Sequence, residues 1–561
     1  LTMLDDFFRF IGPVVAVVVG VLFILFRTWQ GVLLPLVTVI MVVIWITGIM
    51  ALFGITVNIV SYIVPTLIIL VGVADAIHIL VKYHEEFDRT RDKSRAMEDT
   101  LRRIGAAIFL TSFTTAVGFL SLTTTNIVIV RQFGAMVAAG VVLAFVSTVT
   151  FLPAMLTLLR PPSEGILARS RRSVRHRFIQ WVVKATNRYP LVIVSLSFGT
   201  VVAFSLLAMR VDPHSSLMED LKKGTRLYDD LVFMERTMGG VLPLEVLVTP
   251  RGEGKTIPGS VKDPQVLSQI ANLQAFLETI PEIGKAVSLV DYVRELNRAF
   301  HGGLPEYYEL PGSRQGVSQL LLLSGGRADF LANRDYSTAR VSARIVDVTS
   351  KRAAEISEEI REWSRRNLGE SIEVRLTGTT LMALKTNQYL VKNLVVSFLV
   401  AFAVILVAMG LLFRSFRVAL ISMVPNVIPI LVMGGVMGLT HIKLRPTTAM
   451  TFAIAFGIAV DDTIHYLARF RQELAAAHGR YQAANERTLF TTGKAIVSTS
   501  MILVLGFLVL VVSSFIPTRD FGFLAAVTLA GALVGDLFFL PSVLSLVRPS
   551  IPRVAGPGGH H

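Results

Sequence analysis

Long apolar stretches recur along the chain and predict its architecture. Each has about 20 apolar residues, the length that an α-helix needs to cross the hydrocarbon core of a bilayer. The eleven stretches are 7–26, 32–53, 59–81, 106–127, 133–158, 189–210, 391–413, 416–439, 447–468, 494–515 and 521–546. Of all residues, 53% are hydrophobic and 17% are charged, and the mean hydropathy is +0.62. The pattern therefore predicts a polytopic α-helical membrane protein.

The longest polar region, residues 211–388, has the pattern of a folded α+β domain. β-Forming residues cluster or alternate in three segments, and two further segments show helical periodicity behind a capping residue. The predicted strands are 242–250, 336–348 and 371–378, and the predicted helices are 263–280 and 350–367. Strand–helix–strand halves of this kind favour a ferredoxin-like split βαβ fold. Residues 290–330 have no assignment.

Positive charge gathers on one side of the predicted spans. The net charge is +14, but region 211–388 holds 22 basic and 24 acidic residues. Residues 160–188, by contrast, hold eight basic residues and one acidic residue. Alternate threading puts this segment on the same side as the basic residues at span ends, which are Arg27, Arg102, Arg103, Arg414, Arg417, Arg469, Arg471 and Arg548. The positive-inside rule makes that side cytoplasmic and explains the charge without nucleic acid as a partner.

The chain contains an internal repeat, which decides how its spans are organised. An offset of 387 residues aligns "FRTWQGVLLPL" with "FRSFRVALISM", and after one inserted residue an offset of 388 aligns "FLPAML" with "FLPSVL". The matched polar residues include Asp75 with Asp462, His78 with His465, Thr111 with Thr499 and Ser112 with Ser500. Two long registers of this kind predict two pseudo-symmetric halves.

The second repeat contains more than the first, because a span and the polar region precede its five further spans. We therefore expect a missing N-terminal span and first external domain, and twelve spans in the intact protein; an asymmetric eleven-span protein is the alternative. The predicted divisions are a first-repeat bundle of spans 2–6 (1–160), a basic cytoplasmic linker with an interfacial helix (161–188), span 7 (189–210), a periplasmic porter-like domain (211–388), a second-repeat bundle of spans 8–12 (389–548) and a tail with a tag remnant (549–561).

Ionisable residues interrupt two of the predicted spans, where each charge costs about 3 kcal/mol to bury in lipid. The stretch "FGIAVDDTIHYLARF" carries Asp461, Asp462 and His465, and its repeat partner carries Asp75 and His78. Residues three or four apart share a helix face, so each histidine can meet an aspartate. Pseudo-symmetry would gather three carboxyl and two imidazole groups at a shielded centre. Such groups can exchange protons there, which predicts a proton relay.

Further polar residues are candidates to support this relay: Thr111, Ser112, Thr499, Ser500 and Asp536. The competing interpretation is structural. The aspartates and histidines could cap helix ends near the cytoplasmic surface, and Ser and Thr often bond only the preceding helical turn. Recurrence in both repeats favours the relay for Asp-x-x-His, whereas Asp461 has Ala74 as its counterpart and Asp536 has Thr148.

Other segments bear on where the chain meets the membrane and on which classes of activity are expected. Trp181, with Phe178 and Val182, predicts an amphipathic helix at the inner leaflet. The external region contains no metal-ligand spacing, nucleophile elbow or phosphate loop, so neither enzymatic activity nor a cofactor is expected. The chain has no cysteine, so its external domain has no disulfide.

The charged motifs resemble those of a known superfamily. "GIAVDDTIHYLARF" and "VGVADAIHILVKYHEEF" are similar to the fourth- and tenth-span motifs of RND (resistance-nodulation-division) transporters. With "GDLFFLPSVLSL", they resemble the MMPL-like exporters, a branch that includes hopanoid and other lipid transporters. The resemblance covers essentially the whole chain. It implies twelve spans, two porter-type external domains, a cycle driven by proton entry, and relay roles for Asp75, Asp462 and Asp461.

Two departures from the superfamily bear on the relay. Its multidrug branch places paired acids in one repeat and a lysine in the other, whereas both repeats carry Asp and His here. Its mycobacterial lipid branch pairs Asp with Tyr, whereas Ala76 and Thr463 follow the aspartates here. The histidines are therefore expected to take the role of the missing partner.

The sequence thus predicts a secondary transporter of the bacterial inner membrane that couples proton entry to export of a hydrophobic or amphipathic molecule, such as a hopanoid or sterol-like lipid. The alternatives are a multidrug or solvent efflux pump, a lipid sensor and a protein that assists secretion; sodium remains open as the coupling ion. The expected partners are a lipid substrate, membrane lipids, a periplasmic protein and further copies in a dimer or trimer, but no nucleic acid.

Overall fold

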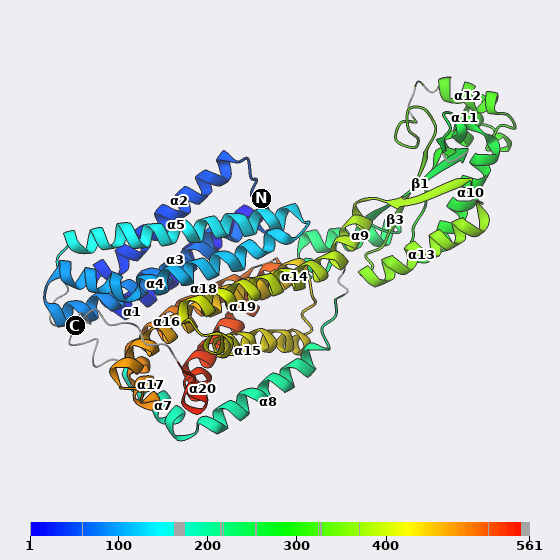
Figure 1. Cartoon of the computed structure of the whole chain (residues 1–561). Coiled ribbons are helices and arrows are strands. Elements are labelled where there is room, and N and C mark those ends of the chain that lie inside the picture. Colours follow the sequence, from blue (N-terminus) through cyan, green and yellow to red (C-terminus); the bar gives the residue numbers. More distant parts are fainter. Residues whose placement is uncertain are drawn as a thin grey trace. The chain divides into compact units, whose positions relative to one another are not determined.

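The protein consists of a helical bundle and a smaller α+β unit (Figure 1). The bundle is formed by Leu1–Pro213 with Leu390–His561, and the α+β unit by His214–Tyr389. The computed structural model describes residues 2–58, 60–161, 174–213, 216, 218–252, 255–323, 325, 328–369, 371–513 and 515–550. Residues 162–173 of the predicted basic linker and 551–561 of the C-terminal tail lie outside these ranges.

The described part of the bundle has ten helical segments that are long and apolar enough to cross a membrane, and Phe10–Phe26 is a shorter apolar one. Its helices are α1 (Thr2–Phe26), α2 (Trp29–Leu52), α3 (Val64–Thr90), α4 (Lys93–Leu120), α5 (Val128–Leu158), α7 (Val174–Arg188), α8 (Pro190–Ala208), α14 (Thr379–Phe413), α15 (Phe416–Thr440), α16 (Pro446–Ala476), α17 (Tyr481–Thr491), α18 (Gly493–Val509), α19 (Ile516–Val534), the π-helical turn η7 (Gly535–Phe539) and α20 (Leu540–Val547). Short 3₁₀ turns lie at Ser61–Ile63, Ser121–Thr124 and Leu510–Val512. The chain is a polytopic helical membrane protein.

The two sequence offsets reappear in the starts of the helices. Adding 387 to the first residue of α2 gives the first residue of α15, and adding 388 to the first residues of α4 and α5 gives those of α17 and α19. The loop between α16 and α17, residues 477–480, is two residues longer than 91–92 of the first repeat, because one residue is inserted and α16 ends one residue earlier than α3. The pseudo-two-fold bundle that the repeat predicts is therefore confirmed.

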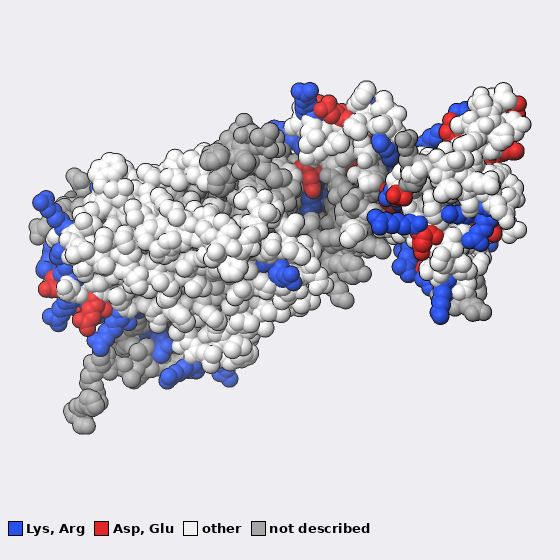
Figure 2. All heavy atoms as spheres, turned by 90° about the horizontal axis from the view of Figure 1, so that it is seen from above, with Lys and Arg blue, Asp and Glu red and all other residues white. Residues whose placement is uncertain are grey.

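Helices α3 and α16 lie at the centre of the bundle. All of the apolar window of α3 and 83% of that of α16 are buried. Helix α4 packs against both of them, and α18 packs on α3 (Figure 1). We call the end of the bundle where α3 and α16 finish and α4 begins the basic end. Figure 2 shows basic side chains gathered at one end of the bundle, and a flank that is almost free of charge.

Helices of different repeats touch closely at two glycines. A Cβ on Gly118 of α4 would lie 2.9 Å from the Cα of Gly457 on α16, so only glycine allows this approach. In the equivalent place of the other repeat, Leu70 of α3 fills the space beside Gly506 of α18. Small residues at such crossings are typical of membrane helix packing. These contacts hold the two repeats together on the far side of their charged residues from the basic end.

Helix α8 is held mainly by α15. A side chain on Gly435 or Gly438 of α15 would overlap the backbone of Phe204 or Leu207 of α8. None of the residues of α8, all of which the structure describes, is buried in the protein. Nearer the basic end, an apolar cavity of about 340 Å³ lies among α8, α14, α15 and η7.

The amphipathic helix predicted around Trp181 is α7. Ile179 and Val182 are buried against the bundle, and Trp181 is largely exposed apart from an edge contact with Phe538. The helix therefore docks one apolar face on the protein. Its place at a membrane interface stays a prediction.

The α+β unit is built on an antiparallel sheet. Strand β1 (Leu242–Gly252) pairs with β3 (Ala339–Ile345) on one side and β4 (Ile372–Thr377) on the other, and β2 (Lys255–Thr256) extends its end. Residues 283–287 add an edge to β3 through bridges from Ile283 and Val287. The unit's helices are α9 (Arg226–Met238), α10 (Pro264–Leu277), α11 (Leu289–Phe300), α12 (Arg314–Leu323) and α13 (Ser350–Asn367), with 3₁₀ turns at Met218–Asp220, Ser260–Lys262 and Pro305–Tyr307.

This strand order, β4–β1–β3–(283–287), is that of a ferredoxin-like split βαβ fold. Helix α10 connects β1 to the edge segment, and α13 connects β3 to β4. The fold class predicted from the sequence is confirmed, and the unassigned region 290–330 contains most of α11 and all of α12. An ion pair of 2.7 Å from Arg352 to Glu282 joins α13 to the edge and holds the pKa of Glu282 below its usual range.

Candidate functional site

Two histidines from different repeats meet at the centre of the bundle. The ring of His78 on α3 stacks on that of His465 on α16, with centroids 3.8 Å apart and planes 12° from parallel. Both residues are 5% exposed. They are matched by the 387-residue offset, so the pseudo-two-fold axis passes between them. As predicted, α3 and α16 face each other, and their histidines are in direct contact.

In each repeat, the aspartate accepts a hydrogen bond from an equivalent serine. Ser112 Oγ of α4 donates to Asp75 at 3.0 Å, and Ser500 Oγ of α18 donates to Asp462 at 2.7 Å. Both aspartates are buried. In the second repeat Thr499 adds a further bond to Asp462 at 3.2 Å. These hydroxyls therefore do more than bond the preceding helical turn.

Asp461, which has no counterpart in the first repeat, sits between the two halves of the site. Its Oδ1 is 3.4 Å from Nε2 of His465, four residues on along α16. Its carboxyl group interacts electrostatically with Asp75 and Asp462 and is hydrogen-bonded to the hydroxyl of Thr111. The structure thus gathers three carboxyl and two imidazole groups, as the sequence predicts.

Asp536 belongs to a neighbouring polar cluster. It lies in η7, a π-helical turn of the kind often found at functional sites. Thr463 Oγ1 donates to its Oδ1 at 2.5 Å, and Asn426 of α15 donates to the same threonine at 3.1 Å. Thr463 directly follows Asp462 on α16, so this chain of bonds joins the last span to α16.

The sequence reasoning missed Asn426 and the role of Thr463. Asn426 stands in "VPNVIP", where an uncharged residue between two prolines changes the apolar pattern little. An amide inside an apolar span was nevertheless a signal, because a buried polar group needs a partner. Thr463 was noted only as a departure from a family motif.

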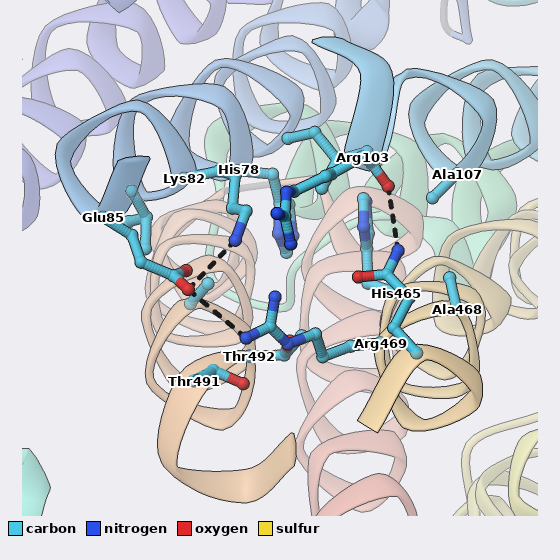
Figure 3. Close-up of a pocket in the computed structure, with 14 residues that line it drawn as sticks. His78, Lys82, Glu85, Arg103, Ala107, His465, Ala468, Arg469, Thr491 and Thr492 are labelled. Atoms are coloured by element: carbon cyan, nitrogen blue, oxygen red, sulfur yellow. Dashed lines mark hydrogen bonds and ion pairs between the residues drawn. The ribbon is translucent and has the colours of Figure 1, made fainter. Parts of the chain in front are cut away.

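A network of ion pairs lies between the histidine stack and the basic end (Figure 3). Arg469 of α16 contacts Glu85 of α3 at 3.3 Å, and Lys82 contacts the same Glu85 at 3.0 Å. Glu86, whose side chain is 3% exposed, binds Lys82 at 2.9 Å and Arg103 of α4 at 3.2 Å. The sequence placed Arg103 and Arg469 only among the charges at span ends.

The chemistry that this arrangement supports is proton exchange. Carboxyl and imidazole groups change charge by gaining or losing a proton, and burial makes each change in charge energetically large. A shift of charge between α3 and α16 therefore changes how these helices attract each other. Among the described residues, no group of three or more His, Cys, Asp or Glu could hold a metal ion.

Comparison with known proteins decides the family. The MMPL family model matches residues 6–193 and 324–555, which is most of the chain. The chain belongs to the MMPL family. The RND-type resemblance of its span motifs is thereby confirmed, and this MMPL chain is a multi-pass membrane protein of the transporter class.

Relatives and a solved structure agree with this assignment. The MMPL chain is 31% identical to the putative membrane protein MJ1562 of Methanocaldococcus jannaschii over 303 residues, 53% of this chain and 76% of that protein. It is 31% identical to the hopanoid transporter HpnN of Rhodopseudomonas palustris over 107 residues, 19% of this chain and 12% of that protein. It is 29% identical to the trehalose monomycolate exporter MmpL3 of Mycolicibacterium smegmatis over 148 residues, 25% of this chain and 14% of that protein.

The fold is similar to that of the hedgehog release protein Disp from the water bear Hypsibius dujardini. The TM-score is 0.69 at 14% sequence identity, and the match covers 98% of this chain and 71% of that one. At this identity the likeness establishes the fold alone.

Proposed function

We propose that this MMPL chain is a proton-driven secondary transporter that exports a lipid-like molecule from the inner membrane, with its α+β unit on the periplasmic side. The observation that carries the proposal is the contact between the two Asp-x-x-His motifs. Their histidines stack at 3.8 Å, and each aspartate is buried and bonded by a serine of its own repeat. A pair of motifs that only capped helix ends would not need to meet in this way.

The apolar cavity supports a hydrophobic substrate. It lies between α8 and α15, is lined by side chains such as Phe198, Leu431 and Phe539, and has a volume of about 340 Å³. Pockets of a few hundred Å³ with apolar walls are typical of small-ligand sites. Two relatives of this chain are named as a hopanoid transporter and a trehalose monomycolate exporter, which favours a lipid over other hydrophobic molecules.

The relay would work through the attraction between α3 and α16. When Asp75, Asp461 and Asp462 are charged, they repel one another across the pseudo-two-fold axis, and protonation removes this repulsion. The hydroxyls of Ser112 and Ser500 rotate freely and can serve the carboxyl groups in either state. A proton that enters the site therefore favours one packing of the repeats, and its release favours the other.

Substitution of the relay aspartates tests the proposal. We expect Asp75→Asn and Asp462→Asn, in liposomes with a pH gradient, to reduce the flux of a fluorescent sterol analogue to that of protein-free vesicles. An amide cannot carry a proton through the cycle. Asp230→Asn is the matched control, because its side chain is 67% exposed in the α+β unit. Flux by Asp462→Asn equal to that of the unmodified protein would contradict the relay.

A further inference from the structure

A small polar cavity lies between the histidine stack and the basic end of the bundle. Its volume is about 50 Å³, room for about three waters at the roughly 15 Å³ that each needs. His78 and His465 line its inner end, and Lys82, Arg103 and Arg469 are among its other walls (Figure 3). Nε2 of His78 is buried and has no hydrogen-bond partner in the described part of the chain.

On the opposite side of the charged site, the two repeats are in close contact. There Gly118 of α4 and Gly457 of α16 touch backbone to backbone, and Thr115 Oγ1 donates to the carbonyl oxygen of Gly457 at 3.1 Å. Gly457 stands one helical turn before Asp461, so this contact lies just beyond the acids. The cavity approaches the site from the basic end, and the Glu85–Arg469 pair stands at its mouth.

Two bonds between the repeats bracket the cavity. Arg469 of the second repeat contacts Glu85 of the first at 3.3 Å, and Gln472 Nε2 donates to the carbonyl oxygen of Arg103 at 3.2 Å. Arg469 has a second partner, Glu473, at 2.8 Å on its own helix. It contacts both carboxylates at once, so the bond to Glu85 can break while the bond to Glu473 keeps the guanidinium paired.

We propose that this cavity is the cytoplasmic half-channel of the relay and that Arg469 is its gate, closed while it is bound to Glu85. The inference rests on the proposed function. A guanidinium at a narrow mouth repels hydronium, and a fixed arginine excludes protons from other membrane pores in this way. Release of Arg469 from Glu85 leaves this cation on Glu473, removes a bond between the repeats and lets protons pass between the histidines and the cytoplasm.

The accessibility of the cavity can be measured without any transport, because the chain contains no cysteine. Ala468 lines the cavity, whereas Ala455 on the same helix is 1% exposed in the apolar core. We expect a water-soluble methanethiosulfonate reagent to label Ala468→Cys but not Ala455→Cys. Adding Arg469→Gln or Glu85→Gln should raise the labelling rate of Ala468→Cys severalfold, because either change removes the bond across the mouth.

The gate itself is tested by proton leak into protein-containing vesicles without substrate, followed with an internal pH dye. We expect Arg469→Gln to leak protons severalfold faster than the unmodified protein, and Arg469→Lys to restore most of the barrier. The matched control is Arg471→Gln, since Arg471 instead donates to the carbonyl oxygen of Leu412 on α14. Adding Asp462→Asn to Arg469→Gln should abolish the leak, because the proton must still pass the acids.

The outcomes separate this inference from the function on which it rests. If Ala468→Cys is not labelled, or Arg469→Gln vesicles stay as tight as the unmodified ones, the gate is wrong even if Asp462→Asn stops transport. A leak that persists in the double variant also overturns it, because the protons then bypass the relay. Undiminished transport by Asp462→Asn contradicts the proposed function, whatever the labelling shows.

Discussion

At the scale of single residues, the two repeats share the serine–aspartate hydrogen bond and differ in their other acidic residues. Ser112 and Ser500 hold their aspartates in the same way. Only the second repeat adds Asp461, and Asp536 of the last span faces Thr463 beside it. The acids of the site therefore lie mainly on the second half, while the histidines are shared equally.

Thr463 links Asp536 to Asn426 by hydrogen bonds, so its hydroxyl should stabilise this polar cluster. Asp536 Oδ1 accepts its bond from Thr463, and Oδ2 has no hydrogen-bond partner among the described residues. Thr463→Val keeps the shape but leaves a buried carboxyl group without its donor, which typically costs about 1–3 kcal/mol. We expect this loss in the free energy of unfolding measured in detergent.

Thr463→Ser is the control for this prediction, because it keeps the hydroxyl that bonds Asp536 and Asn426. The valine variant would contradict the prediction if it were as stable as the serine variant.

At the scale of helices, periodicity and caps predicted where most elements lie. Apolar stretches of membrane-spanning length located the spans, and Asp263 caps α10 of the α+β unit as expected. The cap of α13 is Thr349, one residue before the expected Ser350. The π-helical turn at Gly535–Phe539 was not predictable, because its residues read as part of one continuous apolar span. Gly535 at its start packs against the carbonyl oxygen of Pro425 on α15.

The crossing of α4 and α16 should tolerate no side chain at its centre. Gly118→Ala places a methyl group 2.9 Å from the Cα of Gly457, and backbone cannot move aside as a side chain can. Overpacking of this kind costs about 1–3 kcal/mol. We expect a lower melting temperature in detergent for this variant.

Gly105→Ala is the matched control on the same helix, since no atom lies within 4 Å of its added Cβ. It should be neutral or slightly stabilising, because alanine favours a helix more than glycine does. Equal melting temperatures for the two variants would show that the repeats move apart at no cost.

At the scale of the whole molecule, the repeat predicted the central site, but not which side chains touch. The offset paired His78 with His465, and pseudo-symmetry required that equivalent helices face each other. The sequence could not show that the rings stack, because that depends on the rotation of each helix about its axis. The Glu85–Arg469 pair joins residues 384 positions apart, and such charges at span ends usually face solvent.

The orientation of the chain in the membrane remains a prediction of its charge pattern, and thiol labelling can test it. Glu486 on α17 and Lys222 in the α+β unit are both exposed, and no native cysteine interferes. We expect Glu486→Cys to be labelled by an impermeant reagent in inside-out vesicles, and Lys222→Cys in right-side-out vesicles. Labelling of both from the same face would contradict the positive-inside assignment.

The distance from the Gly118–Gly457 crossing to Arg469 determines how far Arg469 moves when α16 tilts. Arg469 stands 12 residues beyond Gly457, roughly 18 Å along the axis of α16 at 1.5 Å per residue. If Gly457 is the fulcrum, a tilt of about 5° swings Arg469 through roughly 1.6 Å. That displacement exceeds what a 3.3 Å contact can absorb. If protonation tilts α16 in this way, as the proposed function implies, the Glu85–Arg469 contact breaks while Gly118 and Gly457 stay together.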